Sequence, residues 1–145
     1  MIQNLLQHAV IIDGLTLPPP TELEPYEWTD IPADFGQVRG FGGAVPYVVT
    51  ALDGTFQITC KPTDAAYAFL AHLRATKKAA ALAGGVATFT LTHLRGDTGE
   101  TWVGTECTFA DKPGMISKEQ PTAVTWTINA AVVAINPPTL NPLVA

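Results

Sequence analysis

Residues 53–61 read Asp-Gly-Thr-Phe-Gln-Ile-Thr-Cys-Lys, and from Thr55 onward polar and apolar side chains alternate. A period of two places every apolar side chain on one face of a β-strand. The Asp-Gly pair in front is a turn signal, and Pro62 behind it ends the strand because proline has no amide hydrogen to donate to a sheet. These residues therefore predict a strand with one buried face and one polar face.

Behind Pro62 the apolar period changes to that of an α-helix. The apolar residues follow i, i+3, i+4 and i+7 spacing and so share one helix face. They are Ala66, Phe69, Leu70 and Leu73. Thr63 or Asp64 is the candidate N-cap, whose side chain accepts hydrogen bonds from the first free amides. We predict a single helix, which ends before Gly84-Gly85.

Further alternating runs lie before and after this helix. A strand at residues 10–12 ends in a turn at Asp13-Gly14, two runs between residues 86 and 109 flank a turn at residues 96–99, and residues 124–133 form the longest strand. The second half of that last strand is apolar on both faces, so we expect both to be covered. The order predicts a mainly β (α+β) fold, an antiparallel β-sandwich or open barrel with one flanking helix, in a single domain of residues 1–145.

Residues 35–50 combine four glycines with bulky apolar side chains. Two interpretations stay open. The segment is either a long bent hairpin whose apolar residues are covered only after assembly, or an ordinary loop folded onto its own core. Its candidate inter-subunit residues are Phe35, Val38, Phe41, Val45, Tyr47 and Val48. The tail at residues 136–145 holds three prolines and should be extended.

The bulk composition favours self-assembly. Charged residues make up 14% of the 145 residues, against about 25% in a typical soluble protein, and the mean hydropathy is +0.20. Apolar surface left over after one core is filled is ordinarily covered by a partner subunit. The net charge is −5, and residues 1–38 contain six acids and no Lys or Arg. Without a basic cluster to neutralise phosphates, any contact with DNA should be non-adhesive.

The sequence also indicates the cellular compartment in which we expect the chain. No apolar run approaches the roughly 20 residues of a membrane-spanning helix, and residues 1–8 lack the basic region of a secretory signal. We therefore expect no membrane contact and synthesis and retention in the cytoplasm. Cys60 and Cys107 then favour free thiols over a disulfide, and two cysteines are too few for a zinc site.

No motif predicts a catalytic, cofactor or metal site, so we expect no enzyme. Asp97-Thr98-Gly99 matches the tripeptide of aspartic proteases, but Arg95-Gly96 precede it and Glu100 follows it. A hairpin turn explains these residues better, because turns select Gly, Asp and Thr. The three histidines share no metal-ligand spacing. They are His8, His72 and His93.

An ordered pattern over residues 27–135 resembles the tail tube proteins of contractile-tailed, myovirus-like phages. It includes the glycine-rich segment 35–49 and a hairpin at residues 96–100. The remaining pieces are Asp53-Gly54-Thr55-Phe56-Gln57-Ile58, the helix opening Pro62-Thr63-Asp64-Ala65-Ala66-Tyr67, the run Trp102-Val103-Gly104-Thr105-Glu106-Cys107-Thr108-Phe109 and the strand around Trp126-Thr127-Ile128. None of these pieces is a catalytic signature.

The resemblance implies a virion structural protein. Members of that family form stacked hexameric rings whose inner sheets join into one continuous β-barrel around the channel for genome ejection. It implies that residues 35–50 dock on the neighbouring ring and that exposed strand edges serve assembly. The implied lumen-facing candidates are Thr88, Thr90, Thr92, Thr125, Thr127 and Asn129.

The implied partners are copies of the chain itself, the tail sheath, baseplate and tape-measure proteins, and double-stranded DNA that passes without specific contact. The implied location is the virion tail, with the host cytoplasm during assembly. Two alternatives stay open. The first is another tail structural subunit, namely a tail terminator or baseplate hub, and the second is a dimeric aspartic protease that uses Asp97-Thr98-Gly99.

Overall fold

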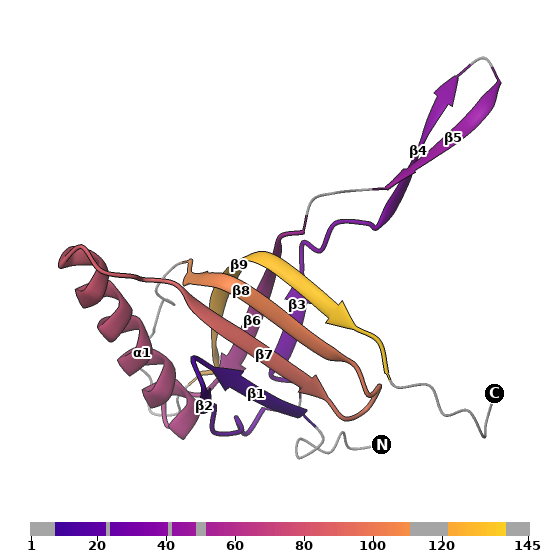
Figure 1. The fold of residues 1–145 in the computed structure, drawn as a ribbon. Helices are drawn as coiled ribbons and strands as arrows, with labels where there is room; N and C mark the ends of the chain where they lie inside the picture. The colour runs from indigo at the N-terminus through magenta and orange to yellow at the C-terminus, as the bar shows by residue number, and fades with distance from the viewer. Residues whose placement is uncertain (1–7, 23, 41, 49–51, 111–121, 139–145) are drawn as a thin grey trace.

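The computed structural model of the chain describes residues 8–22, 24–40, 42–48, 52–110 and 122–138. The elements are β1 (His8–Ile12), β2 (Leu15–Thr16), β3 (Tyr26–Thr29), β4 (Phe35–Gly40), β5 (Gly43–Val48), β6 (Gly54–Cys60), α1 (Ala65–Leu82), β7 (Phe89–Arg95), β8 (Thr101–Phe109) and β9 (Val124–Asn136). Phe41 and the tail residues 139–145, for which predictions were made, lie outside the described ranges. The predicted mainly β fold with one helix is confirmed for the described residues (Figure 1).

Seven strands form one antiparallel sheet in the order β2-β1-β7-β8-β9-β6-β3, and β4 and β5 form a separate hairpin. The strand predicted at residues 53–61 is β6, and its burial alternates as expected, with Phe56, Ile58 and Cys60 buried. β6 has hydrogen-bonded partners on both edges, β9 and β3. The residues that decide the strand in the sequence therefore form an inner strand of the sheet.

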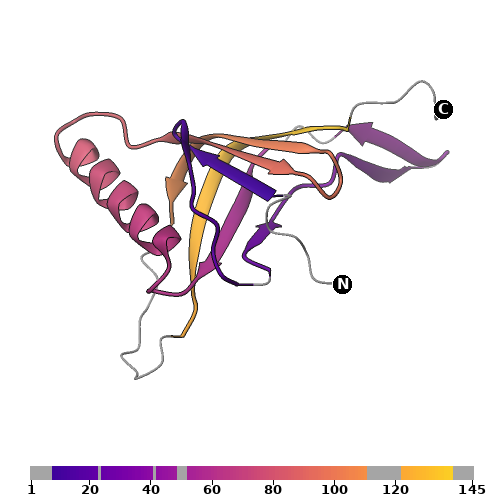
Figure 2. The same cartoon turned by 90° about the horizontal axis from the view of Figure 1, so that it is seen from below.

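The large sheet is curved so strongly that its two ends approach each other (Figure 2). Three strands separate β7 from β3 in the sheet order, yet Trp28 of β3 donates a 3.1 Å hydrogen bond to His93 of β7. The Tyr26 ring of β3 also lies 5.4 Å from the His93 ring. β3 and β7 are thus joined by side-chain contacts and not by backbone pairing. Of the two predicted alternatives the structure forms an open barrel, because the hairpin β4–β5 projects outward instead of packing on the large sheet as a sandwich requires (Figure 1).

The core fills the concave side of the curved sheet, and α1 covers one end of it. Ala66 and Leu70 of α1 are buried, and Phe69 and Leu73 pack against the core, so the predicted helix face is confirmed. The N-cap is Asp64, but the expected capping bond is absent. Its carboxylate instead accepts hydrogen bonds from the Lys61 amide at 3.0 Å and the Thr21 hydroxyl at 3.1 Å. This side chain therefore ties the start of the helix to the segment before β3.

β9 is the longest strand, as predicted, with 13 residues. It pairs with β6 through Ala130 and with β8 through Asn136. Beyond Ala130 no described strand pairs with the β6 side of β9, and the Leu52 carbonyl accepts a single backbone hydrogen bond from Val133 there. The expectation that both faces of this half are covered is wrong for the single chain, because Val132 is 37% and Ile135 41% exposed.

Cys60 and Cys107 are free thiols in the interior. Burial raises the pKa of each to about 11, so both remain protonated at neutral pH. Among the described residues, no helix combines the length and apolarity needed to cross a membrane.

Candidate functional site

The hairpin β4–β5 forms an arm with one wholly apolar face. Val38 pairs with Val45, and Gly36 pairs with Tyr47. Residues paired across two strands share a face, and so do residues two apart. Val38, Val45 and Tyr47 therefore lie together on what we call the arm's apolar face, with exposed fractions of 60%, 61% and 48%. The Tyr47 ring lies so close over Gly36 that no larger residue fits there without displacing it.

The arm's opposite face is more polar, with Gln37 and Arg39 on β4 and with Phe35, 71% exposed, at the base. Of the two interpretations of this segment, the hairpin is observed and the loop folded onto its own core is not. Four of the six candidate inter-subunit residues are thus exposed on the arm. Val48 is placed only by its backbone pairing with Phe35, and Phe41 lies outside the described ranges. The role of all six in contacts between subunits stays a prediction.

A groove of about 490 Å³ lies where the arm joins the body. It is lined by the segments on either side of the arm and by the open half of β9. The lining residues are Ile31, Pro32, Asp34, Leu52, Asp53, Val132, Val133, Ala134 and Ile135. Leu52 is 56% exposed there, and its carbonyl accepts a hydrogen bond from the Val133 amide. Apolar side chains next to an open strand edge are the features that bind an added β-strand.

The convex face of the sheet is polar over β9 and β6. The predicted lumen residues Thr125, Thr127 and Asn129 lie on it, and each has a polar Cα partner on β6. The partners are Thr59, Gln57 and Thr55 respectively. The hydroxyls of Thr59 and Thr125 lie 3.1 Å apart, and the Thr55 hydroxyl donates to Asn129 Oδ1 at 3.3 Å. Neither strand carries Lys or Arg.

The three β6 residues were absent from the predicted lumen set, although their alternation with buried neighbours carries the same signal as that of β9. The other predicted lumen residues lie further along the sheet from this patch, and their place in the lumen stays a prediction. Thr90 and Thr92 lie on β7, which β8 separates from β9, and Thr92 pairs with the apolar residues Ile11 and Val103. Thr88 precedes β7 and is half-buried. The polar patch is therefore centred on β6 and β9.

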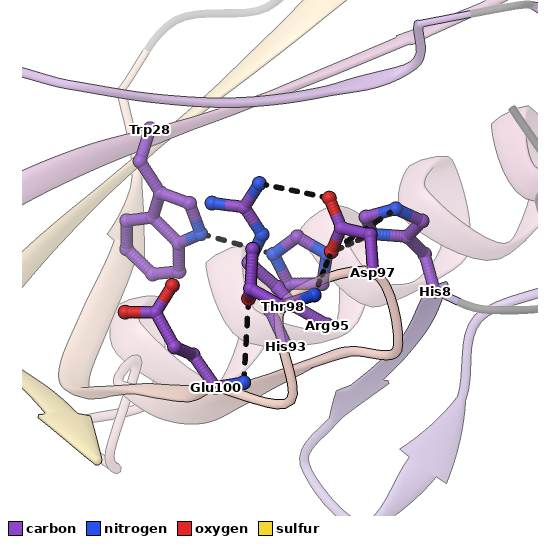
Figure 3. Close-up of polar contacts among 7 residues, drawn as sticks. All are labelled: His8, Trp28, His93, Arg95, Asp97, Thr98 and Glu100. Carbon is purple, nitrogen blue, oxygen red and sulfur yellow. Dashed lines mark hydrogen bonds and ion pairs between the residues drawn. The ribbon is translucent and has the colours of Figure 1, made fainter. Parts of the chain in front are cut away.

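A chain of polar side chains links β3, β7 and β1 on the concave side (Figure 3). Trp28 Nε1 donates to His93 Nδ1 at 3.1 Å, and His93 Nε2 lies 3.1 Å from His8 Nδ1. His8 Nε2 lies 3.7 Å from Asp97 Oδ1, and Arg95 Nη2 donates to Asp97 Oδ2 at 3.2 Å. Both histidines are buried, at 8% and 3% exposed. Sequence reasoning missed this cluster, because its two histidines are 85 positions apart.

The same geometry bears on the aspartic protease alternative. A catalytic aspartate dyad needs a like charge that raises the pKa of one carboxyl. In a dimeric protease the like charge would come from the other chain, and within the single chain Asp97 faces Arg95 and His8. Slight burial raises its pKa, but the hydrogen bond and charge of Arg95 outweigh this and hold the pKa of Asp97 below its usual range. The Asp97 carboxylate also accepts from the Thr98 amide at 3.0 Å. These are the contacts of a hairpin turn, and the described residues contain no group of three or more potential metal ligands.

Solved structures with the same fold come from contractile injection machines. A chain of the sheath–tube complex of an extracellular contractile injection system, PVC, in its extended state is similar at 10% identity and a TM-score of 0.57, over 92% of this chain and 90% of that one. The tube-terminating cap of the anti-feeding prophage matches at 12% identity and 0.59, over 94% and 91%. The PVC sheath/tube terminator matches at 11% identity and 0.57, over 92% and 96%.

No family model and no curated protein matches the sequence. At these identities the structural likeness establishes the fold. The predicted resemblance to tail tube proteins is confirmed at that level, and the chain has a tail-tube-like fold.

Proposed function

We propose that the chain is a non-enzymatic structural subunit of a phage tail or related contractile particle. In this proposal it self-assembles into stacked hexameric rings, which form the inner tube for genome ejection. The observation that carries the proposal is the arm, a projecting hairpin with Val38, Val45 and Tyr47 exposed on one face. A soluble monomer rarely leaves such a surface in water. The fold shared with chains of contractile machines supports it.

The groove at the base of the arm supplies a matching surface on a second copy. It offers Leu52, Val132 and Ile135 as apolar contacts, and beyond Ala130 no described strand pairs with the β6 side of β9. Arm and groove are different surfaces of one chain, so the contact joins copies head to tail. Repeated contacts of this kind produce closed rings or open helical stacks. The proposed ring stack is an assembly of this class.

The polar face of β6 and β9 is the surface we assign to the lumen of the tube. Hydroxyl and amide groups present no fixed cation, and cation–phosphate contacts dominate the affinity of proteins for DNA. Such a lining lets double-stranded DNA pass without holding it. In this proposal the sheath, baseplate and tape-measure proteins are further partners, and the subunit resides in the virion tail after assembly in the host cytoplasm.

A tail terminator is the second candidate function. The observation that favours it is the likeness to the tube-terminating cap and to the sheath/tube terminator. A terminator closes a tube with one ring, whereas a tube subunit stacks many. The two functions therefore differ in the expected length of the assembly.

Electron microscopy of the purified wild-type protein tests both functions. We expect hollow tubes of stacked rings whose length increases with protein concentration, because head-to-tail contacts add subunits at the tube end. Discrete single rings would support the terminator instead. A monodisperse monomer or dimer at every concentration would contradict self-assembly and with it both functions.

The lumen assignment predicts the behaviour of a cationic variant. Asn129→Lys places one lysine per subunit on the polar face, and these lysines should form cationic rings in the bore. Tubes of this variant are expected to bind short duplex DNA at low salt and release it as salt rises, because phosphate contacts release counterions. Wild-type tubes should not bind it.

Ala75→Lys is the matched control, because Ala75 is exposed on α1, away from the polar face. Co-sedimentation of the tubes with labelled duplex measures both variants. Equal DNA binding by the two variants would overturn the lumen assignment while leaving tube formation intact.

A further inference from the structure

We propose that the His8–His93 pair is a proton-sensitive clasp, which holds the two ends of the curved sheet together when both imidazoles are neutral and releases them in acid. The clasp lies where the barrel has no backbone pairing. β3 ends the sheet on one side, β1 and β7 lie near its other end, and Trp28 and the two histidines connect them across the gap.

The hydrogen-bond partners fix the protonation state of both rings. Trp28 Nε1 can only donate, so His93 Nδ1 must accept and carries no proton. The single proton of neutral His93 is then on Nε2 and points at His8 Nδ1, which must accept as well. This places the His8 proton on Nε2, which faces the Asp97 carboxylate. Donors and acceptors alternate correctly from Trp28 to Asp97 only when both histidines are neutral.

One added proton on either ring breaks this chain. Protonated His93 presents an N–H to the Trp28 N–H, and protonated His8 presents an N–H to the His93 N–H. The added charge also has to be buried. Burial, followed by the positive charges of His8 and Arg95, lowers the pKa of His93 to about 4. The neutral clasp therefore stabilises the fold fully above the ordinary histidine pKa of 6.5 and loses this contribution as pH falls toward 4.

Among the described residues, Asp97 of the turn is the carboxylate in contact with the pair. The other groups that face the pair are Tyr26 of β3, Phe56 of β6 and Arg95 of β7, with Glu24 and Glu27 lining the same cavity of about 330 Å³. Asp97 is shared with Arg95, which lies 3.2 Å from it. An imidazolium at His93 would thus face Arg95 and aromatic rings, without a carboxylate of its own.

Release should be local. The contacts between β6, β9 and β8 are backbone ladders and do not involve the histidines. β1 and β3 also pair with β7 and β6 through backbone ladders, but they are the two strands on either side of the gap, and the side-chain links that join them across it pass through the clasp. Acid should therefore loosen β1 and β3 before the centre of the sheet.

Two measurements on the full chain test the clasp independently of tube formation. Imidazole ¹⁵N spectra, in solution or by solid-state NMR of assembled material, should show the Nε2–H tautomer for both His8 and His93 near neutral pH. Hydrogen-exchange protection factors of β1 and β3 should fall on the order of a hundredfold between about pH 6.5 and pH 4.5, since each pH unit between the two pKa values gives a factor of ten. Protection of β9 should change far less.

His93→Asn separates the clasp from general acid sensitivity. The asparagine oxygen can accept from Trp28 in place of Nδ1 but binds no proton. We expect this variant to lose most of the pH dependence at β1 and β3. His72→Asn, on the exposed side of α1, is the matched control and should behave as wild type.

An Nδ1–H tautomer at His93, an ordinary histidine titration of that ring in the folded chain, or unchanged pH dependence in His93→Asn would each overturn the clasp. If His93→Asn does not fold, the tautomers and titration of the wild type decide alone. None of these results depends on whether the protein forms tubes.

Discussion

Val38→Asp should abolish assembly and leave the chain folded. Val38 is 60% exposed on the arm's apolar face, so a carboxylate there changes the free energy of unfolding by no more than about 0.5 kcal/mol. Docked against the apolar groove of a neighbour, the same carboxylate would be buried without a partner, which costs several kcal/mol at every contact. Because about 1.4 kcal/mol is a factor of ten in affinity, the concentration needed for assembly should rise at least roughly a hundredfold.

Gln37→Asp is the control, because it adds the same charge to the neighbouring position on the other face of the same strand. Sedimentation velocity and electron microscopy should show tubes for Gln37→Asp and monomers for Val38→Asp, with equal circular dichroism. Tubes formed by Val38→Asp at the wild-type concentration would show that the apolar face is not the contact. Failure of both variants would show that the contact does not distinguish the two faces of the arm.

The elements that local patterns specify were predicted correctly. The alternation around Phe56 gave β6, and the helical spacing of Ala66 and Leu70 gave α1 with its buried face. Each signal depends only on neighbours within about two turns or one strand. The prediction of an N-cap hydrogen bond was wrong, because the Asp64 carboxylate has other partners. One of them is Thr21, which is 43 positions away in the sequence. Local patterns carry no information on such a competitor.

The order and curvature of the sheet could not be predicted for the same reason. The choice between sandwich and open barrel depends on contacts such as Trp28 with His93, which are 65 positions apart. Predicting the histidine cluster would also have required contacts between residues far apart in the sequence. The sequence left the arm open between two interpretations, because exposed and buried hairpins have the same composition. Only the pairing of Val38 with Val45 and of Gly36 with Tyr47 shows that one face is wholly apolar.

The polar face was predicted in part. Thr125, Thr127 and Asn129 follow from the alternation in β9, but the contribution of β6 depends on the pairing of Gly54–Cys60 with Val124–Ala130. Thr88 lies one residue before β7, which begins at Phe89, so the period of that strand does not fix its face and its place in the lumen stays a prediction. The alternation of polar and apolar residues predicts which side chains of one strand share a face. A patch that spans two strands can be predicted only when the register between the strands is known.

Phe56→Ala should lower the free energy of unfolding by roughly 3–5 kcal/mol, the usual cost of removing a buried phenyl ring. Phe56 is 1% exposed, and its ring centroid lies 4.6 Å from that of Trp28, 5.9 Å from Tyr26 and 5.5 Å from His93. The cavity would therefore open beneath the contacts that join the two ends of the sheet. For a chain of this length the melting temperature should fall by roughly 10 to 15 °C. Urea unfolding of the dissociated chain measures the change.

Phe35→Ala is the same chemical change at an arm position that is 71% exposed, and we expect it to alter the unfolding free energy by less than about 0.5 kcal/mol. Phe35 lies on the same face of the arm as Gln37, opposite the arm's apolar face, so this variant serves as the stability control for the loss of a phenyl ring. An equal loss of stability in both variants would contradict this difference between a buried and an exposed ring. The two phenylalanines therefore compare a side chain that stabilises the fold of the single chain with one that is exposed on the arm.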